Sequence, residues 1–171
     1  MVPKWLGFAL LGVLLGGCPK PPPAPVAPPA PCPDPEPVRL YLLGTERLNP
    51  GEHGEPLATV VRIYQLKAPG HFADATFEDM LDRDKQTLTD ELVSTKELIL
   101  NPGDQIDPQL IRGDGVGYVG VVALFRQPAG TSWRALYKLP PADPYHCRPP
   151  RRRRPPRLYQ AFLDENRVEI R

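Results

Sequence analysis

The stretch TVVRIYQL, residues 59–66, is rich in β-branched and aromatic side chains, which is typical of a β-strand. Successive side chains of a strand point to opposite faces, so Val61, Ile63 and Gln65 share one face. Arg62 and Tyr64 lie on the other face, where we expect them to contribute to packing. The stretch therefore predicts a strand of a sheet core rather than a functional site.

The same kind of pattern recurs along the chain and predicts six further strands. They are expected at residues 38–43, 97–100, 117–126, 132–139, 158–163 and 167–170. The segment 117–126 is continuously apolar, which predicts a central, well-covered strand that pairs with 132–139 across a short turn. Seven strands at this spacing, separated by turns, favour an all-β sandwich.

A short helical insertion is expected between the strands at 59–66 and 97–100. The residues spaced to share one face of a helix are Phe77, Met80 and Leu81. Asp74 or Thr76 is suited to cap this helix, and a second capped turn is expected over residues 87–92. The sequence therefore predicts one helical segment within a chain that otherwise consists of strands and turns.

The first eighteen residues have the pattern of a secretory signal. Lys4 gives a positive start, residues 5–15 form a short apolar run, and Leu15-Gly16-Gly17 precedes Cys18. The run is too short for a membrane span, which needs about 20 apolar residues. The sequence LGGC also resembles the bacterial lipobox, in which cleavage before the cysteine is coupled to its lipidation. An ordinary signal peptide with an incidental cysteine is the alternative; either signal predicts an envelope protein.

A Pro-rich segment follows, with eleven prolines among residues 19–37. Proline fixes φ and lacks the N–H group, so we expect an extended, semi-rigid spacer that holds a folded domain away from the membrane. The folded domain is expected over residues 38–171. It carries a Pro/Arg-rich insertion at residues 140–157.

The three cysteines are informative because of the expected compartment. If Cys18 carries lipid, Cys32 and Cys147 remain as an even pair in an oxidising environment. A disulfide between them and two free thiols both remain open, because the sequence does not give the Cα separation that a bridge requires.

An arginine-rich run lies within the insertion at 140–157. Its members are Arg148, Arg151, Arg152, Arg153, Arg154 and Arg157. Such a run is typical of a nucleic-acid patch, but an envelope address argues against nucleic acid as a partner. Anionic lipid head groups are an available alternative, and a solvated loop kept open by proline and charge repulsion is the simplest interpretation.

Catalytic and metal-binding motifs are absent from the sequence. There is no Gly-Xaa-Ser-Xaa-Gly elbow and no Cys-Xaa-Xaa-Cys pair, and none of the three histidines has metal-ligand spacing. Asp104, Asp107 and Asp114 do not have the spacing of a calcium loop. We therefore expect no catalytic residue, no cofactor and no metal site.

Several ordered stretches resemble one family, the TssJ lipoproteins of the bacterial type VI secretion system, also called SciN or VasD. The stretches that carry the resemblance are LNP at 48–50, GEPL at 54–57, VRIYQLK at 61–67, LILNPG at 98–103 and YVGVVALFR at 118–126, followed by Trp133-Arg134. Phe72, Phe77, Leu81 and Leu88 also fit the pattern, which covers about residues 38–138. The Pro-rich spacer and the insertion at 140–157 depart from it.

The resemblance implies a transthyretin-like two-sheet β-sandwich with a short helical insertion. It implies an outer-membrane lipoprotein that faces the periplasm and binds the C-terminal domain of TssM, an inner-membrane protein. The family uses the loop between the first two strands for this contact. The corresponding residues here are Glu46, Arg47, Leu48, Asn49, Glu52 and His53, and we expect Leu48 to be the apolar anchor.

The predicted function is that of a lipid-anchored adaptor, not an enzyme. Pro19 follows the cysteine instead of the aspartate that commonly retains lipoproteins in the inner membrane, which favours the outer membrane. The alternatives are a periplasmic enzyme or ligand carrier on the same fold, because a fold does not determine function, and a pilotin of another secretion system.

Overall fold

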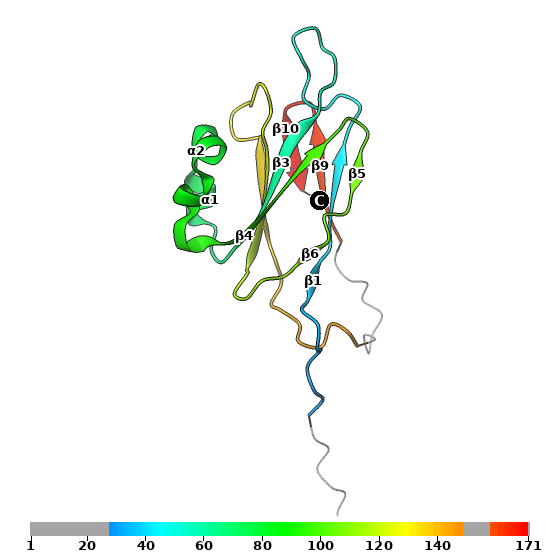
Figure 1. Ribbon diagram of the computed structural model, residues 1–171, viewed down its shortest axis with the longest axis vertical. Helices are drawn as coiled ribbons and strands as arrows, with labels where there is room; N and C mark the ends of the chain where they lie inside the picture. Colours follow the sequence, from blue (N-terminus) through cyan, green and yellow to red (C-terminus); the bar gives the residue numbers. More distant parts are fainter. Residues whose placement is uncertain (1–27, 149–157, 171) are drawn as a thin grey trace, which may run out of the picture.

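The computed structural model describes residues 28–148 and 158–170 and consists mainly of two four-stranded sheets (Figure 1). The β9 sheet has the order β10-β9-β2-β5, and the β3 sheet has the order β4-β3-β7-β8. The first contains β2 (Leu40–Gly44), β5 (Gln105–Ile106), β9 (Tyr159–Asp164) and β10 (Arg167–Ile170); the second contains β3 (Thr59–Leu66), β4 (Leu92–Leu100), β7 (Tyr118–Ala123) and β8 (Arg134–Lys138). The expected two-sheet sandwich and all seven expected strands are confirmed.

Side-chain alternation along the strands fills the core between the two sheets. Val61 and Ile63 of β3 are 0% and 1% exposed, and Leu40 and Leu42 of β2 are 2% and 0% exposed. Gln65 shares the inward face of β3 and is satisfied there: it donates to the carbonyl of Ile111 and accepts from a backbone N–H. The strand over residues 117–126 is central, as expected, because β7 pairs with both β3 and β8.

The helical insertion covers the outer face of the β3 sheet. It comprises α1 (Gly70–Asp74), α2 (Phe77–Asp82), α3 (Asp84–Leu88) and the 3₁₀ turn η1 (Thr89–Glu91). Arg62 donates to the carbonyls of Met80 and Leu81 over 2.8 and 3.1 Å, and the Tyr64 hydroxyl donates to Asp84 over 2.9 Å. Arg62 and Tyr64 therefore connect strand and helices, which is the packing role expected for them.

Close packing of the insertion requires a glycine in β7. A Cβ added at Gly120 would lie 2.5 Å from the ring of Phe72, a buried residue of α1. The absent side chain lets α1 approach the sheet directly. The glycine within the apolar run therefore reflects this approach rather than a break in the strand.

The structure corrects two expected boundaries. Thr76 caps α2 in a reciprocal capping box with Asp79, as expected, but no capped turn begins at Thr87, because α3 already starts at Asp84. The strand expected at residues 97–100 starts at Leu92, since Leu92 and residues 94–100 pair with β3. Pairing with a neighbouring strand, rather than the local apolar pattern, sets its length.

A two-stranded element that the sequence did not predict closes the lower end of the sandwich. It consists of β1 (Pro37–Val38) and β6 (Leu110–Ile111), which pair antiparallel. Pro37 was expected to end the free spacer and instead belongs to this element. The signal segment with Cys18, residues 19–27 of the Pro-rich segment and the arginines at 151–157 lie outside the described residues.

Candidate functional site

The loop between β2 and β3, residues 45–58, projects from the upper end of the sandwich (Figure 1). Backbone hydrogen bonds close it at two levels: Leu57 donates to the carbonyl of Leu48 over 3.0 Å, and Gly51 donates to that of Glu55 over 2.8 Å. The loop therefore has internal structure and presents its tip in a defined way.

Two of the six expected contact residues are buried and anchor this loop. Leu48 is 0% exposed, so it is a core residue and is not available as the expected apolar anchor for a partner. Asn49 is 5% exposed; its amide donates to Ala58 and its side-chain oxygen accepts from Arg126. Asn49 also has a positive φ of 48°, which this residue type tolerates better than most. Both residues fix the loop.

The other four expected residues are exposed. Glu52 forms an ion pair with Arg126, and the backbone N–H of His53 donates to the carboxylate of Glu55 over 2.9 Å. The carboxylate of Glu46 lies over the neighbouring turn, where a Cβ added at Gly103 would be 2.7 Å from it. These exposed residues of the loop are thus mostly charged, whereas its apolar residue Leu48 points into the core.

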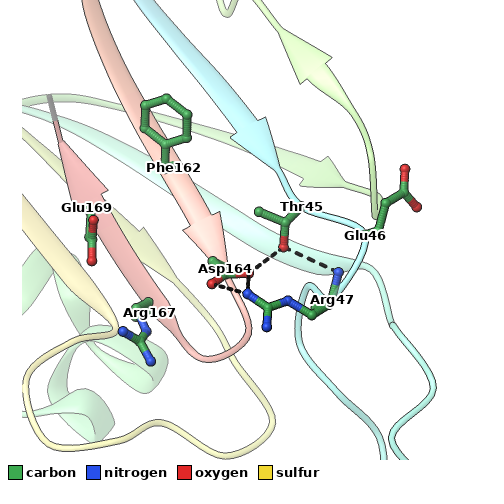
Figure 2. A pocket seen from close by; sticks show the side chains of 7 residues that line it. All are labelled: Thr45, Glu46, Arg47, Phe162, Asp164, Arg167 and Glu169. Atoms are coloured by element: carbon green, nitrogen blue, oxygen red, sulfur yellow. Dashed lines mark hydrogen bonds and ion pairs between the residues drawn. The ribbon is translucent and has the colours of Figure 1, made fainter.

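An open depression with a volume of about 500 Å³ lies beside the start of this loop (Figure 2). Its lining residues are Thr45, Glu46, Arg47, Phe162, Asp164, Arg167 and Glu169. Arg47 donates to both carboxylate oxygens of Asp164, over 3.0 and 2.9 Å, and Thr45 donates to the same carboxylate over 2.7 Å. These bonds tie the loop to the β9–β10 hairpin.

The sequence predicts this hairpin as two strands but does not mark it as part of the candidate site. β9 pairs parallel with β2, which places Phe162 beside Leu43 although the two are far apart in the chain. No local motif marks the hairpin. A long-range pairing of this kind leaves no spacing signal in a single sequence.

The opposite end of the sandwich holds the N-terminal segment covalently. Cys32 and Cys147 form a disulfide with a Cα–Cα distance of 5.8 Å, which resolves the two alternatives left open by the sequence. Hydrogen bonds reinforce it: the backbone N–H of Cys32 donates to the carbonyl of Pro144 over 2.7 Å, and the guanidinium of Arg148 donates to the carbonyl of Ala30 over 2.7 Å. Part of the expected insertion is therefore packed at the base.

A partly buried ion pair continues this attachment above the disulfide. The guanidinium of Arg112 lies 3.1 Å from the carboxylate of Glu36, and their side chains are 9% and 22% exposed. The backbone of Arg112 also donates to the carbonyl of Glu36. Residues 32–37 are therefore part of the domain rather than of a free spacer.

Within the described ranges, no group of three or more His, Cys, Asp or Glu side chains is arranged to hold a metal ion. Among those same residues, no helix is both long enough and apolar enough to cross a membrane.

Residues 36–155 match the family model described as type VI secretion lipoprotein, VasD, EvfM, TssJ. The chain belongs to this family. The resemblance that the sequence suggested is thereby confirmed, and the TssJ-family match extends beyond the stretches that first carried it. No curated protein gives a significant match to this TssJ-family chain.

Solved structures share the fold of this TssJ-family lipoprotein. The lipoprotein TssJ1 from Pseudomonas aeruginosa is 23% identical, with a TM-score of 0.66, over 80% of this chain and 95% of that one. Serratia marcescens Lip, described as a membrane-bound component of the type VI secretion system, is 21% identical, with a TM-score of 0.62, over 77% of this chain and 94% of that one.

A third similar chain comes from a structure described as the type VI secretion protein TssM C-terminal domain from EAEC. It is 23% identical, with a TM-score of 0.63, and the match covers 78% of this chain and 96% of that one. At these identities the likeness establishes the fold of the TssJ-family sandwich.

Proposed function

We propose that this TssJ-family lipoprotein tethers the periplasmic C-terminal domain of TssM to the outer membrane. Acyl chains on Cys18 hold the N-terminus in the membrane, and the 45–58 loop binds TssM at the far end of the sandwich. The observation that carries the proposal is the arrangement of the two ends. The chain enters the domain at the base, and the loop projects from the top (Figure 1).

The attachment at the base suits a tether. A pull on the N-terminal segment reaches Cys32 first, and the disulfide passes it to Cys147 and the segment that follows β8. The small β1–β6 pair is then protected from being peeled away. Disulfides persist in oxidising compartments, which supports a periplasmic location.

The structure of the loop suits a binding site. Leu48 and Asn49 fix its base, so little conformational freedom is lost when a partner binds its exposed tip. Glu46, Arg47 and Glu52 give it a charged surface, which favours orientation and association rate in an encounter. One of the similar chains comes from a solved structure that is described as the TssM C-terminal domain. This description supports the choice of TssM as the partner.

The proposal is tested by titrating the purified C-terminal domain of TssM against the full chain in detergent. The central variant replaces residues 51–55 by two glycines and keeps Leu48 and Asn49. Surface loops tolerate such shortening at small thermodynamic cost, so the sandwich remains folded while the dissociation constant rises at least about tenfold.

Two matched charge reversals sharpen the test. Glu52→Lys changes the loop and Asp114→Lys changes an exposed residue in the turn that precedes β7. We expect weaker binding for the first and wild-type binding for the second. Equal dissociation constants for the wild-type and shortened-loop proteins would place the TssM site elsewhere.

A further inference from the structure

The lower end of the domain is a small tip at which the N-terminal segment leaves the sandwich (Figure 1). This basal tip consists of residues 30–36 and 141–148, which the Cys32–Cys147 disulfide joins. The guanidinium of Arg148 donates to the carbonyl of Ala30 over 2.7 Å, so it contacts the chain where it leaves the domain. The basal tip therefore includes the part of the domain that lies closest to Cys18 along the chain.

The exposed side chains of the basal tip include an aromatic ring with a cation beside it. Tyr145 is 39% exposed, and the guanidinium carbon of Arg148 lies 5.4 Å from the centroid of its ring. Both side chains combine an apolar body with a polar end, and tyrosine is enriched where a membrane meets water. The pair therefore has the chemistry of a lipid–water interface.

The backbone of the basal tip also suits such an environment. Every backbone N–H group of residues 145–148 has an acceptor within the tip. In chain order these are the carboxylate of Asp143 at 2.8 Å, its carbonyl at 3.2 Å, the sulfur of Cys32 at 2.9 Å and the carbonyl of Tyr145 at 2.9 Å. Pro144 has no N–H group to satisfy. This segment can thus leave bulk water without stranding a backbone donor.

The chain between the proposed anchor and the basal tip is short. A chain from Cys18 to Ala30 spans at most about 40 Å even when it is fully extended. The 45–58 loop lies at the opposite end of the sandwich (Figure 1). An acyl anchor on Cys18 therefore keeps the basal tip at a high local concentration beside the membrane, so a contact that is weak in solution becomes populated.

We propose that the basal tip rests on the outer membrane and places the ring of Tyr145, with Arg148 beside it, among the lipid head groups. This inference rests on the proposed function, because it needs the anchor on Cys18. It goes beyond that function by giving the tethered domain a fixed orientation, with the 45–58 loop directed away from the membrane.

The size and charge of the basal tip favour a lipid surface as its partner. A standard protein interface takes about 20–30 residues a side, which is more than the tip contains. The carboxylates of Asp34 and Asp143 lie in the same tip as Arg148, so it has no positive excess. We therefore expect burial of the ring, rather than attraction to anionic lipid, to drive the contact.

The test places a fluorescent probe in the basal tip of the lipidated full chain, reconstituted into phosphatidylcholine vesicles. Tyr145→Trp supplies the probe, and lipid with brominated acyl chains quenches a tryptophan that enters the interface. Trp133 is 2% exposed and contributes a background that the wild-type protein measures. We expect the emission of Tyr145→Trp to shift to shorter wavelength and to be quenched about twofold by the brominated lipid.

Ile99→Trp is the matched control, because Ile99 is 63% exposed and pairs with Val60, close to the 45–58 loop. Its emission should be the same in ordinary and brominated vesicles. Combining Arg148→Glu with Tyr145→Trp puts a further carboxylate beside the probe and should reduce the quenching by about half, because a charge resists leaving water. Thermal unfolding checks that each variant is folded.

Vesicle flotation of the same samples separates this inference from the proposed function. Protein that does not float contradicts the anchor itself. Protein that floats while Tyr145→Trp is quenched no more than Ile99→Trp overturns only the membrane contact of the basal tip. A shift to shorter wavelength that bromine does not quench, and that grows with the amount of protein per vesicle, also overturns it, because the ring would then contact a second copy of the chain.

Discussion

Arg62 joins the helical insertion to the β3 sheet through more contacts than any local pattern suggests. Besides the carbonyls of Met80 and Leu81, its guanidinium lies 2.7 Å from Glu97 and 3.7 Å from Asp84, and its side chain is 20% exposed. Tyr64 donates to the same Asp84, and burial together with that bond raises the pKa of its hydroxyl. The sequence placed both residues on one face but could not show that a helix covers it.

Replacing Arg62 by methionine keeps an unbranched side chain and removes all of these bonds. We expect the free energy of unfolding to fall by about 2–3 kcal/mol, since bonds to charged groups contribute about 1.5–3 kcal/mol each and two helix carbonyls lose a donor. Urea unfolding measures the difference. Arg39→Ala, on an exposed side chain, should change stability by less than about 0.5 kcal/mol. Equal losses for both variants would contradict this role.

Asp79 makes the stability of the insertion depend on pH. Its carboxylate accepts hydrogen bonds from the backbone N–H of Thr76 and from Arg83, which lower its pKa from 3.8 to about 2. A pKa below that of the unfolded chain means that the stabilisation is complete above about pH 4 and is lost as the pH falls towards 2.

The comparison of wild type with Asp79→Ala checks this sign. The wild-type unfolding temperature should be the higher one at pH 5–7, and the difference should shrink between pH 4 and pH 2. A difference that stays constant over that interval would assign the effect to helix propensity rather than to the carboxylate.

At the scale of elements, the sequence predicts those strands whose own apolar pattern identifies them without reference to the strand they pair with. Residues 59–66 and 117–126 lie at the centre of the β3 sheet and have continuous or alternating apolar character. The first half of β4 contains Ser94, Thr95 and Lys96, and only its pairing with β3 makes it a strand. The two-residue strands β1, β5 and β6 are too short to leave any periodic signal.

The base of the sandwich makes a separate prediction at this scale. The disulfide closes a sequence separation of 115 residues, so it restricts the unfolded chain strongly. The double variant Cys32→Ser/Cys147→Ser should lose about 2–5 kcal/mol of the free energy of unfolding. Unfolding in urea with and without reductant measures this loss.

Reductant provides the internal control for that experiment. It should bring the wild-type protein to the stability of the double variant and leave the variant itself unchanged. If reduced and oxidised wild-type proteins unfold at the same urea concentration, the bridge does not contribute to stability.

At the scale of the whole molecule, the candidate site was only partly visible in the sequence. The 45–58 loop could be recognised, but an apolar loop residue such as Leu48 fits an exposed anchor and a buried support equally well. Its 0% exposure settles that choice. The hairpin beside the loop could not be predicted, because the parallel β2–β9 pair that brings it there is non-local.

The two ends of the molecule together define the proposed tether. The N-terminal segment is fixed at the base by the Cys32–Cys147 bridge and the Glu36–Arg112 pair, and the loop lies at the other end (Figure 1). Multiple acyl chains on Cys18 would give stable membrane attachment, since each buried CH₂ contributes about 0.8 kcal/mol. Binding and anchoring are then separable properties of one chain.

Vesicle flotation tests this two-ended account most directly. The lipidated full chain is reconstituted into vesicles, the C-terminal domain of TssM is added, and the amount of that domain that floats with the vesicles is measured. The account predicts that the wild-type chain carries the TssM domain upward, and that Cys18→Ser still binds the domain but leaves it at the bottom of the gradient. A TssM domain that stays at the bottom with wild-type vesicles, or floats equally well with Cys18→Ser, would contradict it.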